Sequence, residues 1–506
     1  MSAVPAHPVV RAPTTAEAAR ALLEEAPIIE GEHDDGTLNK TLLDYVWKKP
    51  GKGWWLLFLL GMGGTGFMLL TMTVTIARGI GEWGNNIPIA WALDITNFVW
   101  WIGIGHAGTL ISAILLLFQQ RWRTSINRFA EAMTLFAVVC AGLYPVLHLG
   151  RPWLAYWLFP YPNTMQMWPQ FKSPLMWDVF AVSTYLTTSL LFWYLGLIPD
   201  LASLRDASVG RKRRLVYGFL AFGWRGSARH WNHYKIAYLL LAGIATPLVV
   251  SVHTIVSFDF ATSVLPGWHT TIFPPYFVAG AVFSGFAMVI TLIVPARRFM
   301  KFKHVVTMRH LEAMNKVILL TGMIVAYGYL MEHFFAWYSG DPYEFFVFAN
   351  RRGGPYSPVF WLMVFCNILV PHIFWFKKAR TTIWIMWVAA LFINVGMWCE
   401  RFVIIVTSLH RDFLPSSWSM YFPTWVDGGL FIGTLFFFGT CFLLFLKFLP
   451  AVAITEIKEL RHELAHAAGT SGAPPSHEPP GAGEPGAPGP FGVPVPVPRA
   501  PRGREG

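Results

Sequence analysis

Long apolar runs alternate with short polar segments over most of the chain. About ten of these runs approach the roughly 20 residues that a helix, rising 1.5 Å per residue, needs to cross about 30 Å of hydrocarbon. Lipid offers backbone groups no hydrogen-bond partner, so the runs predict helices rather than open strands. The sequence therefore predicts an all-α integral membrane protein with about ten transmembrane helices. The expected spans are 54–77, 97–118, 129–149, 177–197, 236–257, 276–294, 317–338, 359–375, 383–408 and 425–449.

The composition agrees with lipid as the solvent, since 54% of the residues are hydrophobic and only 13% are charged. We divide the chain into an N-terminal arm at 1–53, a transmembrane domain at 54–449, a surface helix at 450–466 and a tail at 467–506. The tail is rich in Pro and Gly, so we expect it to be disordered. The first fifty residues lack a cleavable signal peptide, so the first span is expected to act as an uncleaved insertion signal.

Lys and Arg are concentrated in alternate loops, at 121–128, 205–235, 297–309 and 377–380. Basic residues in short loops are retained on the cytoplasmic side, which predicts that both termini are cytoplasmic. The formal charge of +11 is then mostly a matter of topology, and it gives no reason to expect nucleic-acid binding.

The four cysteines, Cys140, Cys366, Cys399 and Cys441, all lie inside predicted spans and form no C-x-x-C pair. This pattern excludes an iron–sulfur ligand set, a covalent haem site and a disulfide framework within the chain. No metal site is predicted. A bound small molecule or a partner would have to carry any electrons.

Titratable side chains inside a membrane are costly, so each one is a candidate functional residue. The predicted topology places most of them toward the outer face. His106 and His372 look isolated and are interpreted as packing residues. The full set is His106, His148, Asp178, His253, Asp259, Glu332, His333, His372, Glu400 and Arg401.

Three consecutive helix ends meet the outer surface at His148, Asp178 and Asp259. Tyr144 precedes His148 by one turn and lies on the same face. Singly, Asp178 could be a helix cap and His148 an interfacial residue. Together they suit quinol oxidation, which releases two protons with two electrons and so needs acid–base groups that titrate near neutral pH. Histidine does so unaided, and desolvation brings an Asp toward that range.

Glu332, His333, Glu400 and Arg401 form a second set in the outer parts of two later spans. They could be a proton relay, or Glu400 could form a structural ion pair with an arginine of a neighbouring span. Because adjacent residues point about 100° apart on a helix, Glu400 and Arg401 are not expected simply to neutralise each other.

Several segments resemble one known family. They are 148–153 (HLGRPW), 172–178 (KSPLMWD) and, above all, 251–276 (SVHTIVSFDFATSVLPGWHTTIFPPY), and the likeness continues through 311–340 and 394–418. The chain resembles the NrfD-like (polysulfide reductase membrane subunit) family, and within it looks closest to the C subunit of bacterial alternative complex III. The resemblance covers about 41–449.

The resemblance implies ten spans, eight of them in two four-helix bundles, in the inner membrane of a bacterium. It implies a site for quinol (menaquinol or ubiquinol) near the periplasmic face and no haem or iron–sulfur centre in this chain. The implied partners are an iron–sulfur subunit at that face, multihaem cytochrome c subunits and a second NrfD-like membrane subunit. On this basis the catalytic residues are His148, Asp178 and Asp259, the quinol-binding neighbours are Tyr144, Arg151 and His253, and the proton route comprises Glu332, His333, Glu400 and Arg401.

Three alternatives remain open. A haem b quinol cytochrome would need histidines facing each other across the bundle. An ion- or proton-coupled transporter would be expected to have helices broken near mid-membrane, which the sequence does not show clearly. A structural anchor would leave the titratable cluster unexplained.

Overall fold

The computed structural model describes residues 28–29, 35–158 and 171–467. The predicted disordered tail and most of the N-terminal arm lie outside these residues. The chain divides into two compact units, Met1–Arg461 and His462–Gly506. The first unit contains every helix described below, except that the last turns of α17 belong to the second.

Ten helices in the described residues are long and apolar enough to cross a membrane, which confirms the predicted number. No strand occurs in the described part of the chain. The spans are α3 (Lys52–Arg78), α4 (Leu93–Thr109) continuing through η2 (Leu110–Ile114) and α5 (Leu115–Leu117), α6 (Asn127–His148), α7 (Pro174–Asp206), α9 (Ala228–Ala261), α10 (Phe273–Phe299), α11 (Met308–Tyr338), α13 (Ser357–Val364) continuing through η5 (Phe365–Leu369) and η6 (Pro371–Trp375), α15 (Ile383–Leu409) and α16 (Trp425–Phe448).

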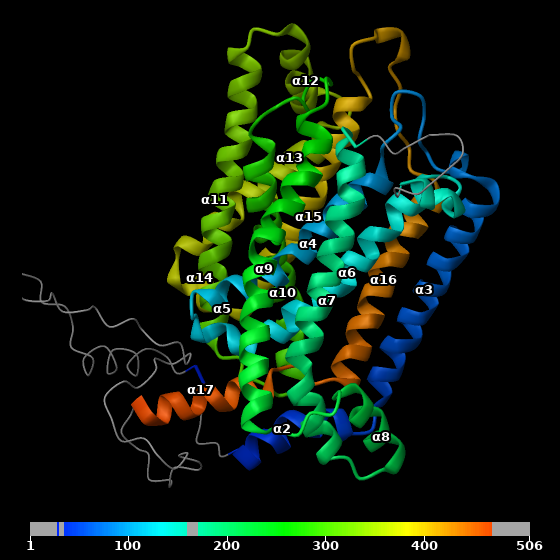
Figure 1. Ribbon diagram of the computed structural model, residues 1–506. Coiled ribbons are helices and arrows are strands. Elements are labelled where there is room, and N and C mark those ends of the chain that lie inside the picture. Colours follow the sequence, from blue (N-terminus) through cyan, green and yellow to red (C-terminus); the bar gives the residue numbers. More distant parts are fainter. Residues whose placement is uncertain (1–27, 30–34, 159–170, 468–506) are drawn as a thin grey trace, which may run out of the picture. The chain divides into compact units, whose positions relative to one another are not determined.

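Eight spans form two four-helix bundles, as predicted. The first bundle contains α4, α6, α7 and α9, and the second contains α10, α11, α13 with its continuation, and α15 (Figure 1). The bundles join where α4 packs against α10 and α15. The remaining spans, α3 and α16, pair with each other, and α16 also packs against α6.

Helix α4 lies at the centre of the unit, and all its residues from Leu93 to Thr109 are buried. Small residues allow its neighbours to approach closely. A Cβ at Gly108 would lie 2.0 Å from the Ala130 carbonyl oxygen of α6, and a Cβ at Gly285 of α10 would lie 2.1 Å from the Ala107 Cβ. Small residues at such crossings are typical of membrane helices, which associate by close packing.

Each bundle also contains a break in its helical regularity. The π-helical segments η2 and η5 interrupt the first bundle at Leu110–Ile114 and the second at Phe365–Leu369. Neither break could be predicted from the sequence, because a π segment has the same apolar composition as the helix around it. Such segments often lie at functional sites.

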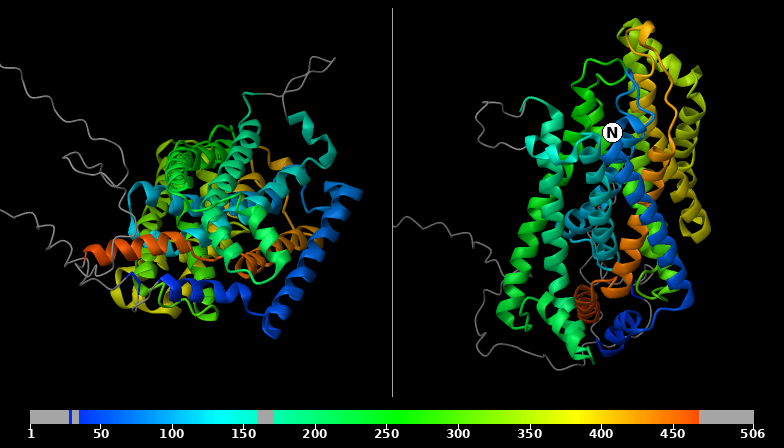
Figure 2. Two further views of the ribbon diagram at one scale, coloured as in Figure 1. Left: turned by 60° about the horizontal axis from the view of Figure 1, so that its bottom comes forward. Right: turned by 90° about the vertical axis from the view of Figure 1, so that its right-hand side faces the viewer.

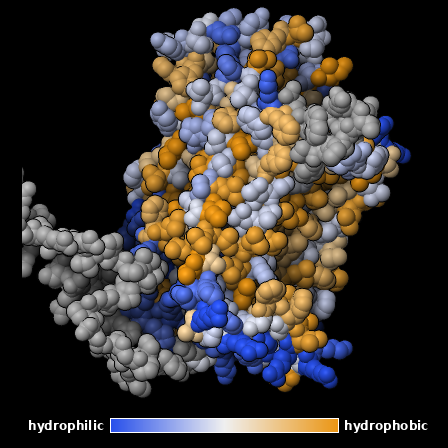
Figure 3. Space-filling model, viewed as in Figure 1, coloured by the Kyte–Doolittle hydropathy of each residue, from blue (hydrophilic) through white to orange (hydrophobic). Residues whose placement is uncertain are grey.

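Shorter helices lie at the two ends of the first unit. We call the end with the Lys- and Arg-rich loops the basic end; it carries α2, α8 and the first part of α17, and Figure 2 brings it forward in its left view. The apolar side chains in Figure 3 form a band above the hydrophilic residues of this end. That both termini are cytoplasmic stays a prediction. The other short elements are α2 (Asp35–Trp47), η1 (Ile80–Glu82), η3 (Arg121–Ser125), η4 (Pro152–Leu158), α8 (Arg211–Leu220), α12 (Pro342–Gly353), α14 (Lys377–Thr381), η7 (Pro415–Ser417) and α17 (Ile454–Ala467).

The predicted surface helix at 450–466 corresponds to α17. It is more than a surface helix, because Ile454, Ile457 and Leu460 are buried in the first unit. Their spacing of three residues places them on one side of the helix.

Candidate functional site

His148 pairs with a residue that the sequence interpretation missed. It is the last residue of α6, and its Nδ1 hydrogen-bonds to Oδ2 of Asp94 in the first turn of α4. The Asp94 side chain is only 2% exposed, and its Oδ1 accepts a hydrogen bond from the backbone N–H of Ala92 at 2.9 Å. The helix dipole favours a carboxylate there. Asp94 fell just outside the predicted span, although an Asp directly before an apolar run could have suggested it.

Asp178 and Asp259 form a second pair. Asp178 lies in the second turn of α7 and Asp259 in the last turn of α9, and their carboxyl groups lie next to each other. Two neighbouring carboxyl groups can share a hydrogen bond when one of them carries a proton. The alternative of Asp178 as a helix cap is wrong, because α7 begins at Pro174 after an N-cap at Ser173.

The three predicted catalytic residues therefore belong to two separate pairs, Asp94–His148 and Asp178–Asp259. Among residues 35–158 and 171–467, no hydrogen bond or ion pair connects Asp94–His148 with Asp178–Asp259. Both pairs nevertheless lie at the end of the first bundle opposite the basic end. Each of its four helices contributes one group there: α4 and α7 at their starts, and α6 and α9 at their last turns.

Two of the predicted neighbours do not join this group. The Tyr144 hydroxyl is buried against α16, 2.9 Å from the Thr434 Oγ1. Arg151 is exposed just after α6. Tyr144 lies one turn before His148, and its hydroxyl hydrogen-bonds to α16.

His253 lies about two turns deeper in α9, where it contacts His106 of α4 with ring centroids 4.7 Å apart. Both imidazoles are fully buried, and their four ring nitrogens have no hydrogen-bond partner among the atoms described. The interpretation of His106 as an isolated packing residue is therefore wrong, since residues far apart in sequence meet only through the packing of α4 on α9.

The second bundle contains a compact polar cluster around Glu400. Contrary to the expectation from helix geometry, Glu400 and Arg401 form an ion pair at 2.7 Å. The long, flexible arginine side chain makes this possible despite the 100° between adjacent residues. Glu400 also accepts hydrogen bonds from the hydroxyls of Tyr276, at 3.4 Å, and Tyr329. Asn367, in η5, donates to the Tyr329 hydroxyl at 2.8 Å.

Glu332 connects this cluster to the end opposite the basic end. It lines a cavity of about 200 Å³ together with His269, Asp341 and Glu344. It also lines a cavity of about 10 Å³ that reaches Glu400, with a volume close to that of one water site. Burial raises the pKa of Glu344, and a hydrogen bond from the Gly267 N–H partly offsets that rise.

His333 and Arg351 line the smaller cavity as well. The His333 Nδ1 lies 2.8 Å from the Tyr329 backbone oxygen. Arg351 is 2% exposed and donates to the Gly267 carbonyl at 3.1 Å. Arg351 lies between the predicted spans 317–338 and 359–375, and it is buried because α12 folds over the bundle.

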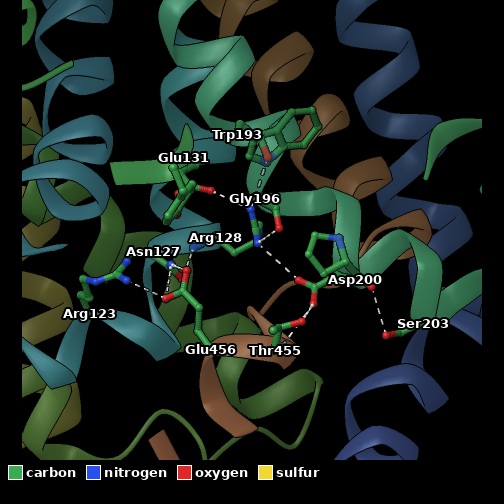
Figure 4. A network of polar contacts seen from close by, with 12 residues as sticks. Arg123, Asn127, Arg128, Glu131, Trp193, Gly196, Asp200, Ser203, Thr455 and Glu456 are labelled. Atoms are coloured by element: carbon green, nitrogen blue, oxygen red, sulfur yellow. Dashed lines mark hydrogen bonds and ion pairs between the residues drawn. The ribbon is translucent and has the colours of Figure 1, made fainter. Parts of the chain in front are cut away.

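A charged cluster near the basic end was also missed (Figure 4). Arg128 of α6 pairs with Glu131 at 3.0 Å and with Asp200 of α7 at 3.3 Å, and all three are buried. Arg123 pairs with Glu456 of α17 at 3.0 Å, and Thr455 donates to Asp200. The sequence interpretation missed this cluster because it assigned Arg128 to the loop at 121–128. Glu131 lies inside the predicted span 129–149 and could have indicated a buried ion pair there.

Ten spans around buried acid–base pairs define a polytopic helical membrane protein. No group of three or more His, Cys, Asp or Glu side chains in the described residues could hold a metal ion. The sequence matches the family described as polysulphide reductase, NrfD, over residues 82–411, and the chain belongs to this family. It is thus a multi-pass membrane protein of the NrfD family.

One relative, from Halobacterium salinarum, is described as a membrane component of a putative dimethyl sulfoxide reductase. It is 27% identical over 284 residues, which cover 53% of the chain and 57% of the relative. The family resemblance is confirmed, whereas the likeness to the C subunit of alternative complex III stays a prediction.

Proposed function

We propose that the chain is the quinol-oxidising membrane subunit of a respiratory oxidoreductase. The observation that supports this best is the gathering of Asp94, His148, Asp178 and Asp259 at one end of the first bundle, one from each helix. Acid–base groups at the end of a membrane-spanning bundle suit an apolar carrier with a polar head group. The basic loops at the other end support assigning this end to the periplasm.

Quinol oxidation removes two protons and two electrons, and the two pairs divide the protons between them. His148 would take one proton, and the Asp94 carboxylate would orient the ring and stabilise the imidazolium, as carboxylates do for catalytic histidines. The Asp178–Asp259 pair would take the other proton. The electrons would pass to an iron–sulfur partner at the same face and then to multihaem cytochrome c subunits.

The finer assignment is to alternative complex III of a bacterial inner membrane, with menaquinol or ubiquinol as substrate and a second NrfD-like subunit beside this one. The motifs at 148–153, 172–178 and 251–276 support it. A dimethyl sulfoxide reductase type of complex, suggested by the relative's name, would use the same quinol chemistry with a different final acceptor.

A haem b cytochrome is disfavoured by the contact between His106 and His253. Two imidazoles that bind one iron from opposite sides, each through a bond of about 2 Å, have ring centroids roughly 6 Å apart. The observed separation is 4.7 Å. A Soret band retained by the purified chain alone would nevertheless overturn the assignment.

His148→Ala tests the proposed site in the purified complex. We expect quinol oxidation to fall by about 100-fold, because general-base groups contribute about 10²- to 10⁴-fold. Asp94→Asn should cause a smaller loss, since the imidazole remains. The control is His372→Ala, because His372 is exposed and contacts Trp375 in a distant part of the second bundle. Wild-type turnover in His148→Ala would remove this residue from the mechanism.

A proton route through the second bundle is a further part of the proposal, comprising Glu332, His333, Glu400 and Arg401. It is favoured by the two cavities that share Glu332 as a lining residue. A carboxyl between two water-accessible spaces can pass a proton from one to the other.

Glu332→Gln should uncouple proton movement from electron transfer. In proteoliposomes with an internal pH dye, we expect the protons moved per electron to fall while quinol oxidation is largely retained. Glu312→Gln is the matched control, because Glu312 lies on the same helix but pairs with Lys316 at 3.4 Å near the basic end. An unchanged proton yield in Glu332→Gln would contradict the route.

A further inference from the structure

Helix α8 exposes an apolar face that the fold leaves uncovered. It joins α7 to α9 at the basic end, and Tyr217 is its one buried residue. Leu215 is 75% exposed, Val216 55% and Phe219 82%. At 100° per residue, Leu215 and Phe219 lie on the side of the helix opposite Tyr217, and Val216 lies on its flank. Phe222, just after the helix, is also 82% exposed.

The first turn of the same helix is strongly basic. Arg211, Lys212, Arg213 and Arg214 follow one another and are all exposed. An amphipathic helix with cationic residues and exposed Leu and Phe is typical of segments that lie in a membrane interface. Basic residues in loops are enough to orient a membrane protein, and they need no apolar face beside them. The exposed apolar residues of α8 therefore distinguish it from an ordinary basic loop.

Contacts with α2 and α16 fix α8 to the transmembrane domain. The Tyr217 hydroxyl donates to the backbone oxygen of Phe448, the last residue of α16, at 2.9 Å. The Tyr217 ring meets Trp47 at 6.0 Å, and the Arg213 guanidinium lies 5.6 Å from the centre of the Trp47 ring. Helix α8 is therefore held in one place, beside the end of one transmembrane span.

The same contacts set the depth of α8. Trp47 ends α2, and exposed apolar residues of the first span begin eight residues later, at Trp55 and Leu56. Phe448, the other contact of Tyr217, ends the last span and is 54% exposed. Helix α8 thus lies at the level where two spans leave the hydrocarbon, which is the depth of the lipid headgroups.

Three further basic residues follow Trp47, the last of them at the first position of α3. Lys48, Lys49 and Lys52 are exposed. We call these lysines, with the four basic residues of α8, the basic platform. It carries seven cationic side chains, four from 211–214 and three from 48–52, next to apolar side chains.

We propose that the basic platform and the apolar face of α8 bind anionic phospholipid in the leaflet at the basic end. Lys and Arg bind phosphate through charge-assisted hydrogen bonds, and arginine can do so with two donors at once. Leu215, Phe219 and Phe222 would lie among the acyl chains just above the phosphates. An acidic soluble protein would match the charges but would leave this apolar face unexplained.

The charge of the platform can be tested by lipid retention. The complex is reconstituted in nanodiscs of phosphatidylcholine mixed with phosphatidylglycerol, transferred to detergent and analysed for bound lipid by mass spectrometry. In Arg211→Gln/Lys212→Gln/Arg214→Gln we expect the retained phosphatidylglycerol to fall severalfold, since the contributions of basic residues near an anionic surface add in binding free energy and multiply in affinity. The control is Lys303→Gln/Lys377→Gln/Lys378→Gln, which removes three exposed bases of the basic end away from α8. Equal retention in the two triple variants would overturn the proposal.

The apolar face needs a separate measurement. Phe219→Cys is labelled with an environment-sensitive fluorophore; Cys140, Cys366 and Cys399 are buried and Cys441 is partly so. In nanodiscs of the intact complex, brominated lipid should quench the label, and aqueous iodide should not. Failure of brominated lipid to quench would show that water or a protein partner covers this face, and would overturn the lipid assignment even if retention had changed.

Discussion

Asp178→Asn should reduce quinol oxidation by about 100-fold while the ten-helix fold stays intact. The residue is 8% exposed and its carboxyl group lies next to that of Asp259, so the pair can hold and pass on one proton. An amide can still donate a hydrogen bond to the Asp259 carboxylate, which preserves the packing, but it cannot take a proton from the substrate. Loss of a general base costs about 10²- to 10⁴-fold in rate. The measurement is turnover at saturating quinol in the purified complex.

The two aspartates should behave as one unit. Asp259→Asn is expected to lose about as much activity as Asp178→Asn, and the double variant little more, since groups that act together are not additive. Asp206→Asn is the control, because Asp206 ends the same helix α7 as an exposed partner of Arg205. Full activity in either single variant, or multiplied losses in the double variant, would contradict a shared proton site.

Arg128→Met should cause the largest loss of stability in the chain. Its guanidinium is 1% exposed and pairs with Glu131 and Asp200, so its removal leaves two carboxyl groups buried without a counter-charge. Breaking a buried ion pair by removing one partner costs about 3–5 kcal/mol. We expect a clear drop in the temperature at which the purified protein loses its monodisperse peak on size exclusion.

A compensating variant tests the cause of this loss. Arg128→Met/Glu131→Gln/Asp200→Asn removes the unpaired charges and should recover part of the stability, because neutral groups are cheaper to bury. Arg225→Met is the control for the loss of one positive charge at the basic end, since Arg225 is exposed. If Arg128→Met behaves like Arg225→Met, the cluster does not support the fold.

Variants of the Asp178–Asp259 pair should change activity, and variants of the Arg128 cluster should change stability. The Asp178–Asp259 pair lies at the start of α7, and Asp200 lies 22 residues later on the same helix. At 1.5 Å per residue this separation is about 33 Å, close to the hydrocarbon thickness. Changes at Asp178 or Asp259 should therefore leave thermal stability unaffected, and changes around Arg128 should leave the quinol-oxidation rate of the folded complex unaffected.

The depth of each group along the membrane could be predicted from the sequence. Apolar run length determines where a helix crosses, so His148, Asp178 and Asp259 were correctly placed near helix ends on one side. The start of α7 was missed by three residues, because Pro174 and the residues after it are apolar enough to lie on either side of the boundary.

The sequence by itself determined the number of spans and the grouping of acid–base residues at one end, since both depend on hydrophobicity along a single axis. Only the tertiary structure decided which groups touch. Asp94 meets His148, His106 meets His253, and Arg128 meets Asp200 through helices that are distant in sequence. Such pairs depend on how each helix is rotated about its axis and which neighbour it faces, and the packing of all ten spans determines both.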